Sequence, residues 1–117
     1  MQFLYLFTQP PYQGPAAKEA LDMALACAAF DQQVSLVFCG RGIYQLMANQ
    51  APAGQHKKSL LGAINALPLY DVDEVFYLAD DLAALGLSPA QLVGHARGID
   101  KTLLQQKLAA SDIIQSF

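Results

Sequence analysis

The stretch DVDEVFYLADDL, residues 71–82, decides the fold that this sequence predicts. Residues 72–78, apolar without interruption from 75 on, are typical of a strand covered on both faces of a sheet, and residues 80–85 continue as a short helix. In an open α/β domain, reactive groups usually lie at the carboxyl end of such a strand. Leu78 occupies that corner here, and no Cys, Ser or His lies in the turn. The stretch therefore predicts a domain that supports a site without supplying its reactive atom.

The rest of the chain alternates strands with helices. Apolar runs predict strands at 3–8, 34–39, 72–78, 92–99 and 113–117, the fourth weakened by Gly94 and Gly98. Amphipathic stripes predict helices at 16–30, 43–47, 57–67, 80–85 and 100–110, with Asp100 as an N-cap and Gly86 as a C-terminal cap. We therefore expect one domain, residues 1–117, of α/β class: an open, mostly parallel sheet of about five strands with helices on both faces.

The amino-acid composition limits the classes of function that this chain can have. Hydrophobic residues make up 54% of the chain and charged residues only 15%, which predicts that part of the surface is an oligomer interface. The net charge of −3 and the absence of a basic stripe argue against direct nucleic-acid binding. No signal peptide and no apolar run of membrane-spanning length is visible. Two cysteines do not make a disulfide framework, so we expect a cytoplasmic protein.

Two candidate groups follow the second predicted strand. Gly40, Arg41 and Gly42 lie between a strand and a helix, where backbone N–H groups could bind an anion. The stretch lacks the third glycine of a dinucleotide fingerprint, since Gln45 stands there, and a tight turn is the favoured reading. Cys39 ends the same strand and is a candidate reactive thiol, although a buried free cysteine mostly acts as a small hydrophobe.

The other ionisable residues favour structural roles. Cys27 lies among alanines, so we expect it to pack in the core. Asp80 and Asp81 suit the first turn of a helix, where the helix dipole favours negative charge. His56 and His95 have no companions at metal-ligand spacing, so we expect no metal and no cofactor. Three basic residues outside the turn are expected to be solvated: Lys57, Lys58 and Arg97.

Several segments, taken together, resemble the TusC/DsrF family, within the DsrE-like sulfur-relay proteins. The resemblance spans essentially the whole chain and rests on the order and spacing of these segments: PYQG at 11–14 before an Ala-rich helix, GIYQL at 42–46 with QAP at 50–52, LPLYDV at 67–72 with Leu82 and Gly86-Leu87 downstream, and SDIIQSF at 111–117. It implies a DsrE/F-like fold with flavodoxin-like layering.

The resemblance also implies partners. Family members form a heterohexamer of TusB-like, TusC-like and TusD-like chains, in which a cysteine of the TusD-like subunit carries a persulfide. The relay receives sulfur from TusA and passes it to TusE and MnmA, for 2-thiouridine at the tRNA wobble position. The persulfide position falls on Leu78 here, and leucine cannot form a persulfide. The resemblance therefore implies a non-catalytic subunit.

Three alternatives remain open at this point. The chain could be a DsrF-type subunit of a dissimilatory sulfur-oxidation relay, which the same resemblance includes. It could be a stand-alone module that binds a small anion or nucleotide at Gly40–Gly42. It could also be an enzyme that carries a persulfide on Cys39.

Overall fold

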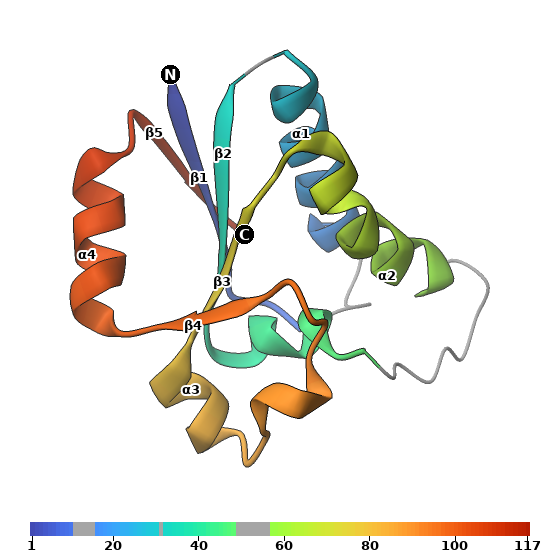
Figure 1. The fold of residues 1–117 in the computed structure, drawn as a ribbon, viewed down its shortest axis with the longest axis vertical. Coiled ribbons are helices and arrows are strands. Elements are labelled where there is room, and N and C mark those ends of the chain that lie inside the picture. Colours follow the sequence, from blue (N-terminus) through green and yellow to red (C-terminus); the bar gives the residue numbers. More distant parts are fainter. Residues whose placement is uncertain (11–15, 31, 49–56) are drawn as a thin grey trace.

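The computed structural model describes residues 1–10, 16–30, 32–48 and 57–117, and these residues build one five-stranded sheet (Figure 1). The strand order is β4-β3-β2-β1-β5, and every neighbouring pair is parallel. The bounds of the strands are β1 (Gln2–Phe7), β2 (Gln33–Phe38), β3 (Glu74–Leu78), β4 (Arg97–Ile99) and β5 (Ile113–Ser116). The predicted open parallel sheet is confirmed.

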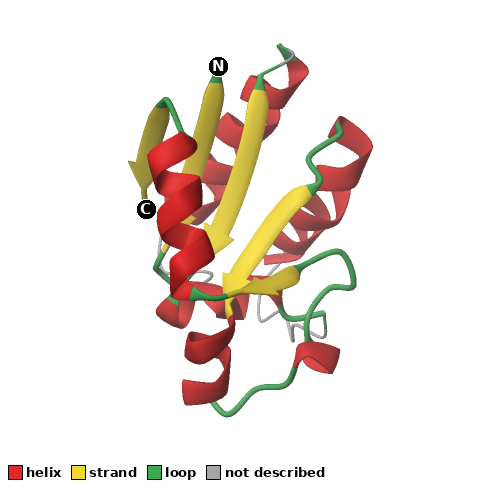
Figure 2. Cartoon of the chain, turned by 60° about the vertical axis from the view of Figure 1, so that its left-hand side comes forward, coloured by secondary structure: helices red, strands yellow, loops and turns green. Residues whose placement is uncertain are grey.

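Helices cover both faces of this sheet, as Figure 2 shows from the side. Helices α1 (Ala16–Ala29) and α2 (Lys57–Ala66) lie on one face, and α4 (Lys101–Ala110) lies on the other. The short α3 (Ala79–Ala84) continues directly from the carboxyl end of β3. The predicted placement of helices on both faces is therefore confirmed.

Strand alternation divides the core into two apolar layers. Successive residues of a strand point to opposite faces, so a strand covered on both sides must be apolar at nearly every position. The sheet residues buried toward α1 and α2 include Tyr5, Phe7, Leu36, Phe38, Val75 and Tyr77. Those buried toward α4 are Leu4, Val37, Phe76, Leu78 and Ile99. This division explains why residues 75–78 contain no polar position.

Local signals set the ends of two helices as predicted. The Asp100 carboxylate accepts a hydrogen bond from the N–H of Leu103 at 2.8 Å, so Asp100 is the N-cap of α4. Gly86 follows α3 with a φ of 73°, a left-handed conformation that glycine adopts without steric cost. Both helix ends are therefore set by single residues that the sequence identifies.

Two predicted elements differ from the structure. The strand over 92–99 was wrong in its first part: Leu92 makes only an isolated antiparallel bridge to Met47, residues 94 and 95 form a turn, and β4 begins at Arg97. Gly94 favours that turn because it has no side chain to pack in a ladder. The short helix over 43–47 is a 3-10 helix, Gly40–Leu46, that begins three residues earlier.

The described residues also bear on the membrane question. No helix among them combines the length and the apolar character needed to cross a bilayer.

A substitution at Gly42 tests how closely the turn after β2 packs against β1. A Cβ atom at residue 42 would overlap the carbonyl oxygen of Phe7, and this backbone is fixed inside the sheet. We expect Gly42→Ala to lower the free energy of unfolding by about 1–3 kcal/mol, the usual cost of overpacking. Urea unfolding monitored by circular dichroism measures this change.

Gly62→Ala is the matched control for this substitution. Gly62 is exposed in α2, and a Cβ there meets open space. Alanine should raise the free energy of unfolding by about 0.5–1 kcal/mol, because it favours the helix over the unfolded chain. Equal unfolding midpoints for the two variants would contradict the close approach at Gly42.

Candidate functional site at the carboxyl ends of β2 and β3

Leu78 lies at the carboxyl end of β3, on the face that α4 covers. Only 7% of the residue is exposed. It belongs to a buried apolar cluster with Leu4, Val37, Phe76 and Ile99, and Leu104 and Leu108 of α4 pack against that cluster. The carboxyl end of β3 is therefore filled by hydrocarbon side chains.

Cys39 lies at the end of the neighbouring strand, β2, and packs against the same apolar cluster. Its N–H donates to the carbonyl oxygen of Phe7 at 2.9 Å, and its carbonyl oxygen accepts from the N–H of Gly42 at 2.9 Å. The residue is half-buried. The structure thus brings Cys39 and Leu78 to one cluster at the carboxyl edge of the sheet.

Asp81 gives this corner its electrostatic character. Its carboxylate accepts a hydrogen bond from the N–H of Gly40 at 2.7 Å, next to the thiol in the chain. Burial, followed by the negative charge of Asp81, raises the pKa of Cys39 to about 11. Both causes disfavour the thiolate, which is the nucleophilic form of cysteine. The thiol is therefore protonated and slow to react near neutral pH.

The Gly40–Gly42 stretch forms the start of the 3-10 helix. Gly40 has a φ of 52°, so its backbone lies in the left-handed region that favours glycine. Its N–H, a donor that an anion would need, is bound to the Asp81 carboxylate, and Arg41 is exposed. The geometry matches a tight turn held by a carboxylate of the chain itself.

Cys27 contacts the centre of the sheet. Its Sγ lies 3.0 Å from the hydroxyl oxygen of Tyr5, which is 1% exposed. Burial and the neighbouring thiol raise the pKa of Tyr5. Cys27 thus gives a buried phenol its polar neighbour, in a contact that joins α1 to β1.

Arg97 is exposed, as predicted, yet it makes specific contacts. Its guanidinium carbon lies 5.0 Å from the ring centre of Phe76, and it donates to the carbonyl oxygen of Asp73 at 3.2 Å. Lys107 lies over the same ring at 4.5 Å and pairs with Glu74 at 2.8 Å. Both cations therefore lie against the Phe76 ring, on the face of the sheet that α4 covers.

The remaining candidates do not gather at the site. His95 lies in the turn before β4, while His56 and the side chains of Lys57 and Lys58 lie outside the described residues. Within the described part of the chain, no three His, Cys, Asp or Glu side chains come together in a way that suits a metal ion.

The Asp81 contact is the feature that sequence reasoning missed. Asp80 is exposed and fits the predicted helix-terminal role, whereas Asp81 reaches across to the turn after β2. The two partners are 41 residues apart, and only the pairing of β2 with β3 brings them together. The one signal available was the order of the elements, because parallel strands place their carboxyl ends at one edge.

The geometry defines an open parallel α/β domain in which Leu78 fills the carboxyl end of β3. The sequence matches the DsrE/DsrF-like family over residues 1–116, and the chain belongs to that family. It is 33% identical over 116 residues to a Protein TusC homolog of Vibrio parahaemolyticus, covering 99% of this chain and 98% of the relative. A Protein TusC homolog of Pseudomonas aeruginosa is 37% identical over 109 residues, covering 93% and 92%. Protein TusC of Klebsiella pneumoniae is 31% identical, covering 97% and 96%.

Solved structures support the fold. The crystal structure of the ychN protein from E. coli superposes with a TM-score of 0.82 at 17% identity, covering all of both chains. The structure of MTH1491 from Methanobacterium thermoautotrophicum superposes with a TM-score of 0.73 at 11% identity, covering 97% of each. These similarities confirm the architecture and carry no statement about activity.

The raised pKa of Cys39 predicts slow alkylation. In a Cys27→Ser background, the iodoacetamide rate at pH 7 should be roughly 100-fold below that of a thiol of ordinary pKa, because a pKa near 11 against 9 leaves that much less thiolate. The rate should keep rising as the pH approaches 11. Alkylation quenched at set times and analysed by mass spectrometry measures this rate.

Asp81→Asn tests how much the charge of Asp81 contributes to the raised pKa of Cys39. The amide can still accept from the Gly40 N–H but carries no charge, so the pKa of Cys39 should fall and the rate at pH 7 should rise. Asp80→Asn, on the exposed neighbouring residue, should leave the rate unchanged. A fast wild-type reaction with a midpoint well below pH 9 would refute this account of the corner.

Proposed function

We propose that this chain is a structural subunit of a TusBCD-type sulfur-relay complex, with TusB-like and TusD-like chains as its partners. The observation that carries this proposal is similarity over nearly the whole chain to proteins named TusC. The family match over residues 1–116 supports the same assignment. In this proposal the complex is a cytoplasmic heterohexamer.

The chemistry of the corner supports a non-catalytic role. In the resemblance described above, the persulfide is carried by a cysteine of the TusD-like subunit, at a position that falls on Leu78 here. A persulfide needs a sulfur atom, and the Leu78 side chain is packed in the apolar cluster under α4. Cys39 is the nearest candidate carrier, and its thiolate is disfavoured by burial and by Asp81. Sulfur transfer is therefore assigned to the partner subunit.

The proposed pathway is the supply of sulfur for 2-thiouridine at the tRNA wobble position. The complex would receive sulfur from TusA and pass it to TusE and MnmA, so this chain would meet tRNA only indirectly. The acidic balance of the chain, net −3, agrees with an absence of direct tRNA binding.

A DsrF-type role in sulfur oxidation is the second candidate, because the chain belongs to the DsrE/DsrF-like family. The stand-alone anion module has weaker support, since the Gly40 N–H already donates to Asp81.

Deleting the chain in its own organism should abolish wobble 2-thiouridine, because the partner that carries the persulfide would lose its structural support. Re-expressing the wild-type chain should restore the modified nucleoside, and so should Cys39→Ser. Mass spectrometry of tRNA nucleosides measures the restored fraction. Leu78→Cys should restore no more than the wild type, since the new thiol would lie in an apolar cluster near Asp81.

Three results would change the assignment. Normal 2-thiouridine with impaired sulfur oxidation in the deletion strain would favour the DsrF-type role. Loss of thiolation by Cys39→Ser, with a normally assembled complex, would make Cys39 a carrier. A nucleotide retained by the purified chain, with no effect of deletion on either pathway, would favour the binding module.

A further inference from the structure

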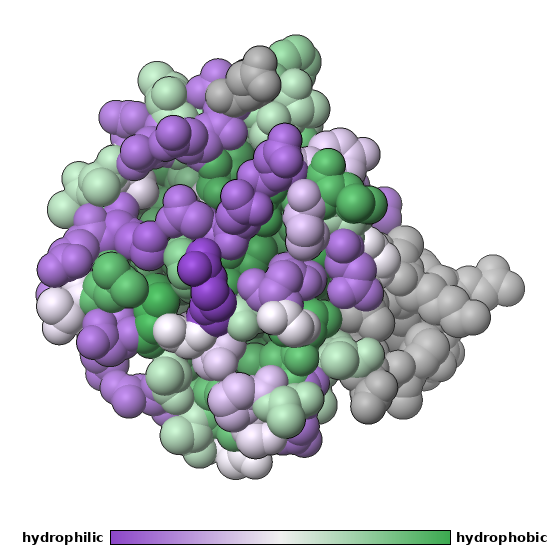
Figure 3. Space-filling view, viewed as in Figure 1, coloured by the Kyte–Doolittle hydropathy of each residue, from purple (hydrophilic) through white to green (hydrophobic). Residues whose placement is uncertain are grey.

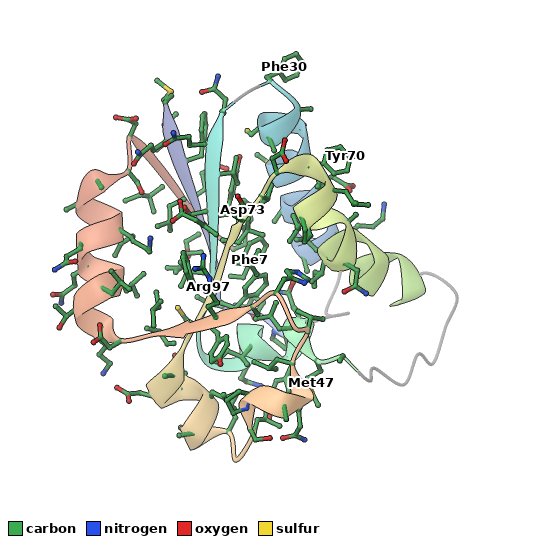
Figure 4. All side chains as sticks on the ribbon, in the orientation of Figure 1. Phe7, Phe30, Met47, Tyr70, Asp73 and Arg97 are labelled. Atoms are coloured by element: carbon green, nitrogen blue, oxygen red, sulfur yellow. The ribbon has the colours of Figure 1, made fainter. Side chains whose placement is uncertain are left out.

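The largest exposed apolar side chains gather at the amino edge of the sheet, away from the corner described above. Phe30 (78% exposed) follows α1, and Leu69 (84%) and Tyr70 (48%) lie in the 3-10 turn Leu67–Tyr70 that follows α2. Figure 4 shows Phe30 and Tyr70 at these neighbouring helix ends, and the turn packs against α1. Met23 (43%) is exposed on α1, about two helical turns before Phe30. These four residues are called the amino-edge patch.

Carboxylates border this patch. A shallow pocket of about 250 Å³ separates the end of α1 from the segment that leads into β3, and Gln32, Asp71 and Asp73 are part of its lining. The only ion pairs within the described residues are Lys18–Asp22 and Lys107–Glu74, so the carboxylates of Asp71 and Asp73 form no ion pair there; Arg97 donates to the backbone carbonyl oxygen of Asp73. Figure 3 shows apolar and polar surface side by side over the ends of α1 and α2. The patch is thus apolar with an acidic margin.

We propose that the amino-edge patch is a docking surface for a protein subunit whose complementary face is apolar and bordered by Lys or Arg. The charges argue against a second copy of this chain. Two copies meeting through this patch by twofold symmetry would bring the acidic margins of both copies, each with Asp71 and Asp73, into one interface, and like charges gathered in an interface cost affinity.

The basic residues of the described part are also poorly placed to serve a second copy. Lys18 and Lys107 are paired, and Arg97 is held over the Phe76 ring. Arg41 and Lys101 are exposed, but Arg41 follows β2 and Lys101 follows β4, so both lie at the opposite edge of the sheet. A different chain with a basic margin therefore fits the patch better than this chain does.

This inference rests on the proposed function for its probe, which is the TusB-like and TusD-like pair from the same organism. Leu69→Ser is the main variant and Leu103→Ser its matched control, because Leu103 is an exposed leucine on α4, across the sheet. We expect Leu69→Ser to weaken binding to the purified pair at least about 10-fold, as an apolar anchor does, and Leu103→Ser to leave it unchanged. Biolayer interferometry measures the affinity, and thermal unfolding confirms that both variants remain folded.

Salt dependence tests the charged margin separately. Asn tolerates the left-handed backbone of Asp71, whose φ is 61°, so Asp71→Asn with Asp73→Asn removes charge without strain. This variant should bind less tightly at low salt and lose affinity less steeply as salt rises, whereas Asp80→Asn should keep the wild-type slope.

The outcomes separate the two proposals. Equal binding by the wild type, Leu69→Ser and the Asn pair would overturn the docking surface and leave the proposed function standing. No binding of the wild type to the pair would overturn the proposed function, and the identity of the docking partner with it. Self-association of the isolated chain that Leu69→Ser abolishes, measured by sedimentation, would show that a second copy covers the patch and would overturn the proposal.

Discussion

Burial of the central strands on both faces is the constraint on which the rest of the structure depends. Val75, Phe76, Tyr77 and Leu78 alternate between the layer under α1 and α2 and the layer under α4, and all four are buried. No polar residue can enter such a strand without losing its hydrogen bonds to water. The strand accordingly ends in an apolar residue, Leu78, and the polar groups of this corner, the Cys39 thiol and the Asp81 carboxylate, come after the strands.

Those residues form a corner with a definite electrostatic bias. The Asp81 carboxylate ties α3 to the turn after β2 and places a negative charge beside the half-buried thiol of Cys39. A site that forms an anionic sulfur species needs positive charge or N–H donors at the sulfur. Here the nearby Gly40 N–H is used by Asp81, and Arg41 is exposed. The same contact that stabilises the corner makes it a poor place for a thiolate.

The elements were predicted from sequence where a local pattern was sufficient. The strands β1 and β3 are apolar after their first residue, β2 is interrupted only by Ser35 after its first residue, and α4 follows the N-cap residue Asp100. The strand over 92–99 failed because apolar residues outweighed the turn signal of Gly94. The Asp81–Gly40 and Tyr5–Cys27 contacts, 41 and 22 residues apart, arise from the packing of whole elements, and no local pattern encodes them.

The apolar residues of this chain fall into two groups, one buried in the core and one exposed on the surface. Most of them fill two core layers instead of one, which a sheet covered on both faces requires. The exposed ones are unevenly distributed over the surface. Of seven large apolar side chains exposed in the described part, four belong to the amino-edge patch, namely Met23, Phe30, Leu69 and Tyr70. Core formation explains none of these four. Their concentration at one edge, opposite the corner that Leu78 fills, places exposed apolar surface away from the edge where parallel α/β domains usually carry out their chemistry.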